Sequence, residues 1–418
     1  MKVITLKNGT RVILEHIPYL RSACLGIWIK NGSRYESQSL SGISHFTEHM
    51  LFKGTQKRTA KEIADEMDAI GGQLNAFTSK EYTCYYARTL DEHLPRGLDI
   101  LADMFFNSNF DDTEIKKECN VIIEEINMYE DTPDEVASDL LQYKIWENYP
   151  LGYPILGSKE TISNFNQNNF KDYFKQKYTP QNIVVVVAGN FEEESTVELI
   201  RTYFEDYNPG GSPNVPDLAI YKKGIVTKEK DIEQLHVQIG FPSINISHDS
   251  IYAMGALNTL FGGGMSSRLF QKIREENGLA YSVYSYNSSY EDVGLFSVYA
   301  SLIKENADDV IYHTFNEIKE LKRTKITSDQ LERTKEQLKS NYILSLESSS
   351  SRMSNIGRSM IMLDRVLSPD QILKKIEAID IDMIYELIDK VLDPQQASLC
   401  VVGPIDGTDF EAKLKKAV

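Results

Sequence analysis

Cysteine is scarce in this sequence: the 418 residues include four, and no two of them form a CxxC motif or another paired spacing. They stand far apart, as Cys24, Cys84, Cys119 and Cys400. Such a distribution argues against a disulfide framework and is expected of reduced thiols in a cytosol. We therefore expect a cytoplasmic protein in which each cysteine is a small core residue.

Long apolar runs are also missing. A helix that spans a bilayer needs roughly 20 consecutive apolar residues, and the longest candidate here is the short IVVVVAG at 183–189. The first residues, MKVITLKNGTRVILEH, lack the apolar core and the small-residue cleavage site of a signal peptide. They alternate like a strand that ends at an Asn-Gly turn. We expect a mature N-terminus and no membrane segment.

Basic residues are in deficit. The chain has 61 acidic and 45 basic side chains, which gives a formal net charge of -16. This balance argues against nucleic acid as a partner, because phosphate binding requires clustered Lys and Arg. It weakly favours basic ligands, although a solvated acidic surface explains it equally well.

The length of the chain predicts more than one core. A chain of 418 residues with 41% apolar side chains fits a soluble protein of two domains, or of two pairs of smaller ones. The clearest linker is NPGGSPNVPD at 208–217, where prolines and glycines exclude a helix or a central strand. We predict a first domain at 1–207 and a second at 218–418.

The two halves share a repeat at an offset of about 214 residues. YTPQNIVVVVAGN at 178–190 aligns with LDPQQASLCVVGP at 392–404, each a Pro-Gln turn that leads into an apolar strand. A second pair aligns the apolar stripes of 113–131 and 329–347. The offset far exceeds the period of a solenoid and indicates an ancient duplication at the scale of a domain.

Short strands such as RVILEH and YTCYYARTL alternate with long amphipathic helices in both halves. This pattern predicts the α+β class, with an antiparallel or mixed sheet in each half and helices packed on one face. The segment SGISHFTEHMLFKGT at 41–55 predicts a helix, with serines as candidate caps, apolar residues at helical spacing and Gly54 as a stop.

The pentapeptide HFTEH stands on this helix, in a chain that has only seven histidines. Residues four apart lie one turn above each other, so His45 and His49 can direct both imidazoles at one metal ion. Glu48 lies on the same side and places a carboxylate beside such an ion. The order is the reverse of HExxH but keeps the two-histidine clamp and an adjacent base.

A catalytic zinc site needs a third protein ligand and an open position. The helix predicted over 111–131 supplies candidates, since Glu118 and Glu125 border its apolar stripe seven residues apart. Glu124 is rotated by about 100 degrees from Glu125 toward another side. A glutamate beside an apolar stripe is more often merely solvated, but two in one row favour a role at the site.

HxxEH, followed 76 residues after His49 by the second glutamate of VIIEEI, resembles the pattern of the pitrilysin family, the inverzincin metallopeptidases. The resemblance covers the whole chain. The sequence looks like that of a bacterial member of the family, similar to the beta subunit of mitochondrial processing peptidase. The resemblance implies that His45, His49 and Glu125 bind one zinc ion per chain, and that Glu48 is the general base. It also implies that Glu118 supports the ligands without binding the metal.

The resemblance extends to substrate binding. GGQLNAFTSKEYTCYYA at 71–87 is similar to the edge strand that holds peptides in this family, with Asn75 and Ala76 at the pairing positions. RLFQKIREENGLAYSV at 268–283 matches the family's arginine and tyrosine. There Arg274 would contact the substrate backbone, and Tyr281 would face the scissile carbonyl.

The second half lacks the metal motif, because LFGGG stands where the repeat would place HFTEH. FGGGMSSRLF at 261–270 lacks the ending of a phosphate loop and resembles the glycine-rich loop of the processing-peptidase branch. A flexible turn explains it as well. We expect two half-shells that form a clam-like chamber, with the second half as the substrate wall.

The function implied by the resemblance is that of a zinc-dependent endopeptidase acting on extended peptides or unfolded segments, as a homodimer. Two alternatives stay open. The chain could be the catalytic subunit of a heterodimer whose partner lacks HxxEH, or a non-catalytic scaffolding homologue similar to the core subunits of a respiratory complex.

Overall fold

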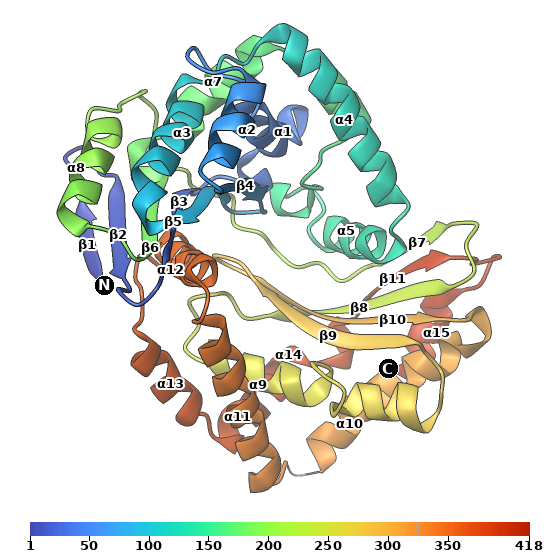
Figure 1. Ribbon diagram of the computed structural model, residues 1–418. Helices are drawn as coiled ribbons and strands as arrows, with labels where there is room; N and C mark the ends of the chain where they lie inside the picture. Colours follow the sequence, from blue (N-terminus) through green and yellow to red (C-terminus); the bar gives the residue numbers. More distant parts are fainter. Residues whose placement is uncertain (325) are drawn as a thin grey trace. The chain divides into compact units, whose positions relative to one another are not determined.

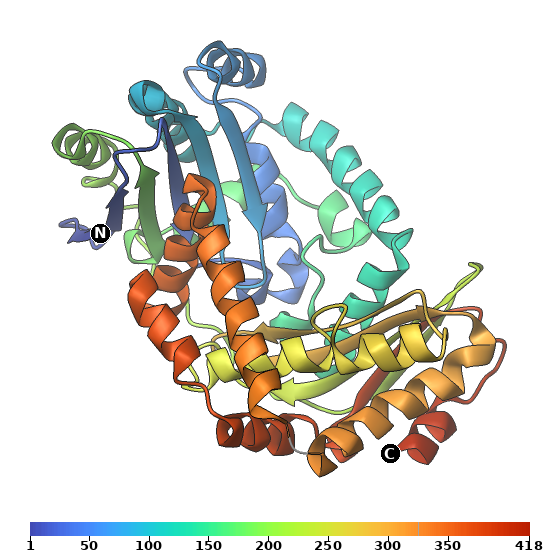
Figure 2. The ribbon, with the colours of Figure 1, turned by 60° about the horizontal axis from the view of Figure 1, so that its bottom comes forward.

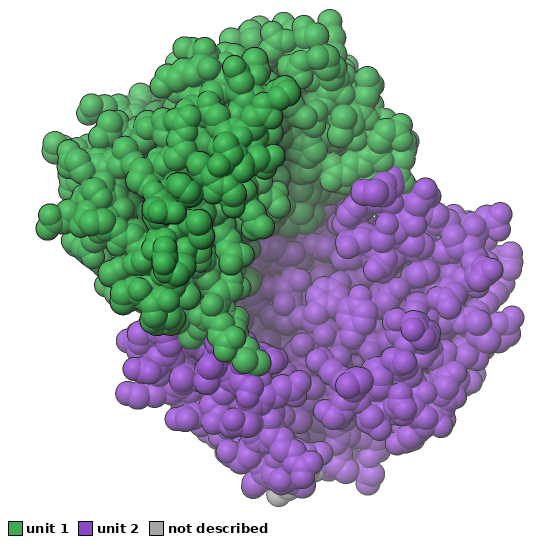
Figure 3. Space-filling model, viewed as in Figure 1, with its two compact units in different colours: residues 1–127, 153–217, 344–366 green, residues 128–152, 218–343, 367–418 purple. Residues whose placement is uncertain are grey.

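The computed structural model describes residues 1–324 and 326–418 (Figure 1). The chain forms two compact units, which Figure 3 colours separately. Unit 1 comprises Met1–Asn127, Tyr153–Asp217 and Leu344–Val366, and unit 2 comprises Met128–Gly152, Leu218–Ile343 and Leu367–Val418. Each unit holds one sheet and its own apolar core, so the predicted α+β class with two similar halves is confirmed.

The sheet of unit 1 has six strands in the order β1-β2-β6-β3-β5-β4. Their bounds are β1 Lys2–Thr5, β2 Arg11–His16, β3 Ser22–Ile29, β4 Gln73–Thr78, β5 Thr83–Leu90 and β6 Ile183–Gly189. Only β2 and β6 pair in parallel, so the sheet is mixed. The run IVVVVAG forms the interior strand β6, which is buried on both faces and is therefore apolar throughout.

The helices of unit 1 lie mainly on one face of this sheet (Figure 1). They are α1 Ile43–Leu51, α2 Ala60–Ala69, α3 Leu94–Asn107, α4 Asp112–Glu130, α6 Lys159–Ser163, α7 Gln167–Lys177 and α8 Glu193–Phe204, with α4 running on past the unit boundary. The core between these helices and the sheet is aromatic, with Phe46 of α1 packed edge-on against Phe170 at 4.9 Å. This core fixes the side of α1 opposite to its histidines.

Unit 2 repeats the arrangement with five strands in the order β7-β11-β8-β10-β9. The strands are β7 Ile225–Glu229, β8 Leu235–Ser243, β9 Ser282–Ser289, β10 Gly294–Leu302 and β11 Ser398–Gly403. Its helices are α5 Pro133–Ile145, α9 Ile251–Phe261, α10 Ala307–Arg323, α11 Ser328–Ser345, α13 Pro369–Glu377, α14 Ile381–Val391 and α15 Phe410–Ala417. β11 pairs in parallel with β7 as β6 does with β2, so the aligned sequences occupy equivalent positions.

The second face of the first sheet is covered by α12, Ser349–Leu363, which comes from the C-terminal half of the chain (Figures 1 and 2). Strand residues alternate between faces, and Trp28 points toward α12, where its Nε1 donates to Sδ of Met353 at 3.1 Å. The helix approaches closely because Gly357 leaves room for the indole: a Cβ there would lie 2.2 Å from Trp28. Helices therefore cover both faces of this sheet.

The second sheet receives a helix in the same way, since α5 from the N-terminal half packs on β8 and β11. Leu141 of α5 lies over Gly240, where an added Cβ would be 2.9 Å from it. The compact units thus differ from an uninterrupted division into 1–207 and 218–418, because two helices are exchanged. The physical reason is that each sheet has a second apolar face that water must not reach.

Two further expectations concern the whole chain. All four cysteines are free, with three buried and Cys119 half-buried. Within residues 1–324 and 326–418, no helix has both the length and the apolar character required to cross a membrane.

Candidate metal centre

Helix α1 carries both histidines of HFTEH. Ile43, Phe46 and Met50 are buried in the core of unit 1, which turns His45 and His49 toward the opposite side. Their ring centroids are 4.5 Å apart. The expected serine cap is wrong: the N-cap is Gly42, in the left-handed region at φ 95°, and it has no side chain with which to cap the helix.

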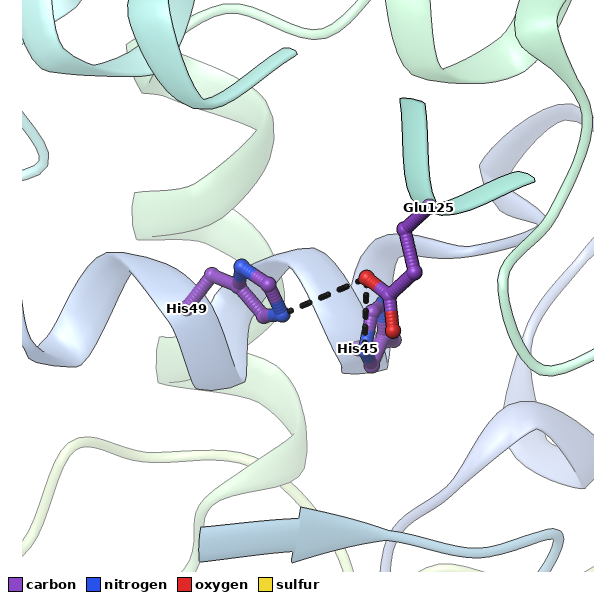
Figure 4. A group of neighbouring side chains, drawn as sticks. All are labelled: His45, His49 and Glu125. Carbon is purple, nitrogen blue, oxygen red and sulfur yellow. Dashed lines mark ion pairs between the residues drawn. The ribbon is translucent and has the colours of Figure 1, made fainter. Parts of the chain in front are cut away.

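Helix α4 brings Glu125 to the two histidines (Figure 4). Its Oε2 lies 3.7 Å from Nε2 of His45 and 3.7 Å from Nε2 of His49. One ligand atom from each of the three residues lies within 4.8 Å of the others. Two ligands about 2.1 Å from a tetrahedral zinc ion are about 3.4 Å apart, so this donor set fits zinc and leaves a fourth position for a non-protein ligand.

Glu118 holds His49 from the side away from Glu125. Nδ1 of His49 donates to Oε1 of Glu118 at 2.8 Å, and Nζ of Lys53 donates to Oε2 at 2.6 Å. Burial alone would raise the pKa of Glu118, but the hydrogen bonds from His49 and Lys53 lower it, so the carboxylate is ionised. With its proton on Nδ1, His49 presents the lone pair of Nε2 to a metal.

His45 is held differently. It is 8% exposed, and burial, together with the nearby His49, lowers its pKa to about 3. The imidazole is therefore neutral at pH 7 and can act as a ligand. Among the described residues, its buried Nδ1 has no hydrogen-bond partner, so nothing holds the ring of His45 in the way that Glu118 holds His49.

Glu48 lies one residue before His49 but is not one of the three clustered ligands. Its Oε2 accepts a hydrogen bond from the hydroxyl of Thr78, at the end of β4. Burial raises the pKa of Glu48, and the charge of Glu125 acts in the same direction, whereas the bond from Thr78 opposes them. A carboxylate with a raised pKa beside a metal site is suited to accept and release a proton.

Asn75 and Ala76 lie on β4, the edge strand of the first sheet, which also contacts α1. They pair with Tyr86 and Tyr85 of β5, and in the described sheet no strand pairs with the other side of β4. Asn75 is exposed and its Oδ1 accepts from the N–H of Ala76 at 2.8 Å. The outer edge is therefore open to a further strand.

Arg274 and Tyr281 belong to unit 2. Arg274 lies in a π-helical turn, Phe270–Glu276, and its guanidinium stacks 4.7 Å from the ring centre of Phe270 and 5.2 Å from that of Tyr281. The glycine-rich loop at 262–264 lines the same cavity of about 470 Å³. The structure brings these two residues together, and their action on a substrate stays a prediction.

The sequence pattern does not single out three residues near the site. Lys53 follows His49 by four residues, and this helical spacing could have predicted their shared contact with Glu118. Thr78 stands in the quoted edge strand, but its contact with Glu48 depends on how β4 lies against α1. Glu36, described below, lies outside any α-helix or strand and carries no periodic signal.

The chain is similar to known proteins in sequence. Residues 11–159 match the family described as Insulinase (Peptidase family M16), and residues 164–338 match its Peptidase M16 inactive domain. A protein of Bacillus subtilis described as an uncharacterized zinc protease is 44% identical over 97% of this chain and 98% of its own length.

Solved structures agree on the fold. A protease from Helicobacter pylori superposes with a TM-score of 0.90 at 22% identity, over 96% of this chain and 99% of that one. A chain of complex III2 from Candida albicans superposes with a TM-score of 0.86 at 20% identity, over 100% of this chain and 99% of that one. Together with the match to the Bacillus zinc protease, the two family matches place this chain in peptidase family M16, the pitrilysin family of zinc metallopeptidases.

Proposed function

We propose that this protein is an endopeptidase of the HxxEH type that hydrolyses peptide bonds in extended peptides or unfolded segments. The observation that carries the proposal is the convergence of His45, His49 and Glu125 from two helices. Next to His49 in the sequence stands a further carboxylate, Glu48, whose Oε2 accepts from Thr78. The names of the relatives as zinc proteases support the proposal.

The residues that would hold one zinc ion per chain are His45, His49 and Glu125. Bound there, zinc would act as a Lewis acid that polarises a carbonyl group and lowers the pKa of water to about 7. The chain prepares two ligand atoms for the ion. Burial keeps the imidazole of His45 neutral, and the bond from Nδ1 of His49 to Glu118 leaves Nε2 of His49 to face the metal.

Glu48 is the proposed general base. Thr78 occupies Oε2, which leaves Oε1 to accept the proton of the attacking water. The same carboxyl then donates this proton to the leaving amine, which must depart as a neutral group. The raised pKa of Glu48 brings its affinity for a proton closer to what both steps need at neutral pH.

The substrate class follows from the edge of β4. An extended peptide can add a strand there through main-chain hydrogen bonds that do not depend on its side chains, with Asn75 and Ala76 at the pairing positions. In a folded domain most strands are already paired on both sides, so an extended segment is the better partner. We further propose that Arg274 contacts the substrate backbone, that Tyr281 stabilises the oxyanion, and that both units enclose the peptide in a chamber.

The proposed assembly is a homodimer, because one chain carries both the metal-site residues and the Arg274 and Tyr281 pair. The main alternative is the catalytic subunit of a heterodimer. A scaffolding role is a weaker alternative: the complex III2 likeness supports the fold alone, and this chain keeps every residue of the proposed site. Peptide cleavage by the purified chain alone would exclude both alternatives.

A peptide-library digest with and without a chelator tests the proposal. We expect cleavage that stops on chelation and returns with zinc, together with about one zinc per chain by mass spectrometry. A chain that is free of metal after purification without chelator, and inactive when zinc is added, would refute it.

A further inference from the structure

The first turn of α1 is held by a carboxylate from outside the helix. Oε2 of Glu36 accepts from the N–H of Gly42, and Oε1 accepts from the N–H of Ser44, each at 2.8 Å. Helix N-termini leave such N–H groups without partners, and Gly42 cannot supply one. Glu36 therefore replaces the missing cap with two bonds, the second of which ends at the residue before His45.

Ser44 is also fixed through its side chain. Its hydroxyl is 2.7 Å from the hydroxyl of Tyr173 in α7, which in turn accepts from Nδ2 of Asn31 at 3.0 Å. Ser44, Tyr173 and Asn31 are all buried. The backbone that leads into His45 is thus tied to the body of unit 1 on two sides.

The two histidines differ in what orients them. Metal-binding imidazoles usually donate their second N–H to an acceptor, which fixes the ring. His49 does so to Glu118, whereas Nδ1 of His45 is buried without a partner. The direction of the His45 ring must then come from its backbone and from the packing around it.

Capping alone explains Glu36 poorly. A glycine N-cap is only a few tenths of a kcal/mol worse than the best caps, whereas a buried carboxylate is unfavourable. Glu36 is 3% exposed, and burial raises its pKa to about 7 against the opposing bonds from Ser44 and Gly42. Because Glu36 accepts from the N–H of Ser44, the residue before His45, the burial is better explained by a role at the metal ligand.

We propose that Glu36 is a positioning residue for the metal ligand His45, acting through the backbone of Gly42 and Ser44. This inference rests on the proposed zinc site. It assigns to Glu36, for His45, the part that Glu118 has for His49.

Glu36→Gln is the direct test. A carboxamide has one oxygen, so it keeps one of the two bonds and turns its own N–H2 toward the other donor. The measurements are the zinc dissociation constant of the full chain, by competition with a chelator, and the visible spectrum of the cobalt-substituted protein. We expect zinc binding weaker by about tenfold or more, and altered cobalt bands.

Asp103→Asn is the matched control. Asp103 is a carboxylate of similar burial that accepts hydrogen bonds from Thr55, Arg58 and Asn107 and from no residue of α1. It should unfold at a lower temperature than wild type but bind zinc and cobalt unchanged. Should Glu36→Gln not fold, Glu36→Asp, which keeps the charge but is one methylene shorter, is measured in its place.

Wild-type affinity and an unchanged cobalt spectrum in the folded Glu36 variant would overturn the inference, as would equal losses in Glu36→Gln and Asp103→Asn. Both measurements are made without substrate. If the wild-type chain binds zinc but cleaves no peptide, the proposed activity is refuted. The Glu36 variants then still show whether Glu36 positions His45. A wild-type chain that binds no zinc would refute both.

Discussion

His49 donates a 2.8 Å hydrogen bond to Glu118, although 69 residues separate them in the sequence. The bond joins α1 to α4, the two helices that supply the clustered ligands. The bond fixes the tautomer of His49. It also holds α1 and α4 at a set distance from each other beside the metal site. Lys53, which donates to the other oxygen of Glu118, keeps that carboxylate ionised and in place.

Removing the charge of Glu118 should weaken metal binding. In Glu118→Gln the amide can still accept from His49, but it loses the ion pair with Lys53, and its orientation is no longer fixed. We expect zinc affinity to fall by about 10 to 100-fold, measured by chelator competition. Glu124→Gln, on the exposed side of the same helix, should match wild type, and an equal loss there would point to a general effect of charge.

Glu48→Gln should keep zinc and lose turnover. The amide cannot accept the proton of the attacking water, yet it can still accept the hydrogen bond of Thr78. We expect kcat to fall by several orders of magnitude, with the zinc content by mass spectrometry unchanged. Retained peptidase activity would remove Glu48 from the mechanism.

Thr78→Val should show whether Thr78 orients the proposed base, Glu48, or binds the peptide substrate. Valine has the shape of threonine without the hydroxyl that holds Oε2 of Glu48. We expect kcat to fall by about 10-fold or more with KM nearly unchanged, because the edge of β4 keeps its backbone donors. Thr78→Ser restores a hydroxyl and should recover most of the rate. A variant that raises KM alone would place Thr78 in substrate binding instead.

The metal-free protein should lose stability in mild acid through His45. Its pKa is about 3 in the folded chain against 6.5 when exposed, so the unfolded chain binds a proton that the folded chain does not. The resulting stability is complete above pH 6.5 and declines as the pH falls. Between pH 7 and pH 5 the loss from this residue is about 2 kcal/mol.

Urea unfolding in the presence of chelator, at both pH values, measures this loss. His45→Gln removes the titrating group and should show a smaller loss than wild type by about that amount. Equal losses in the two proteins would mean that His45 titrates normally in the folded chain.

Gly357→Ala should destabilise unit 1. The added methyl group would meet the Trp28 ring at 2.2 Å, and α12 would have to move outward, so we expect a loss of about 1–3 kcal/mol. Gly255→Ala is the control, since that glycine is also helical but its added Cβ meets only Leu338 at 3.8 Å. The control should be neutral or up to about 1 kcal/mol more stable. Urea midpoints followed by tryptophan fluorescence measure both.

Periodicity explains what could be predicted from the sequence. His45, His49, Glu118 and Glu125 lie on two amphipathic helices, and helical spacing alone indicates which side chains share a side. The duplication could also be predicted from the sequence, because the apolar runs that form β6 and β11 align. In the structure each of these strands pairs in parallel with one neighbour.

Contacts outside regular elements could not be predicted. Glu36 reaches the N–H groups of Gly42 and Ser44 from an irregular segment, whereas the sequence pattern favours a nearby serine as the cap. The stretch that forms α12 reads as an ordinary amphipathic helix, and nothing local indicates that its apolar side belongs on Trp28, more than 300 residues earlier in the chain. Such pairings depend on tertiary packing.

The exchange of α12 also sets an order of events during synthesis. The ribosome makes β3 and β6 early, but the segment that shields Trp28 ends only at Leu363. Until that segment has left the ribosome, one apolar face of the sheet in unit 1 stays exposed to water. A nascent chain therefore cannot complete the fold of the unit that carries the metal-site residues.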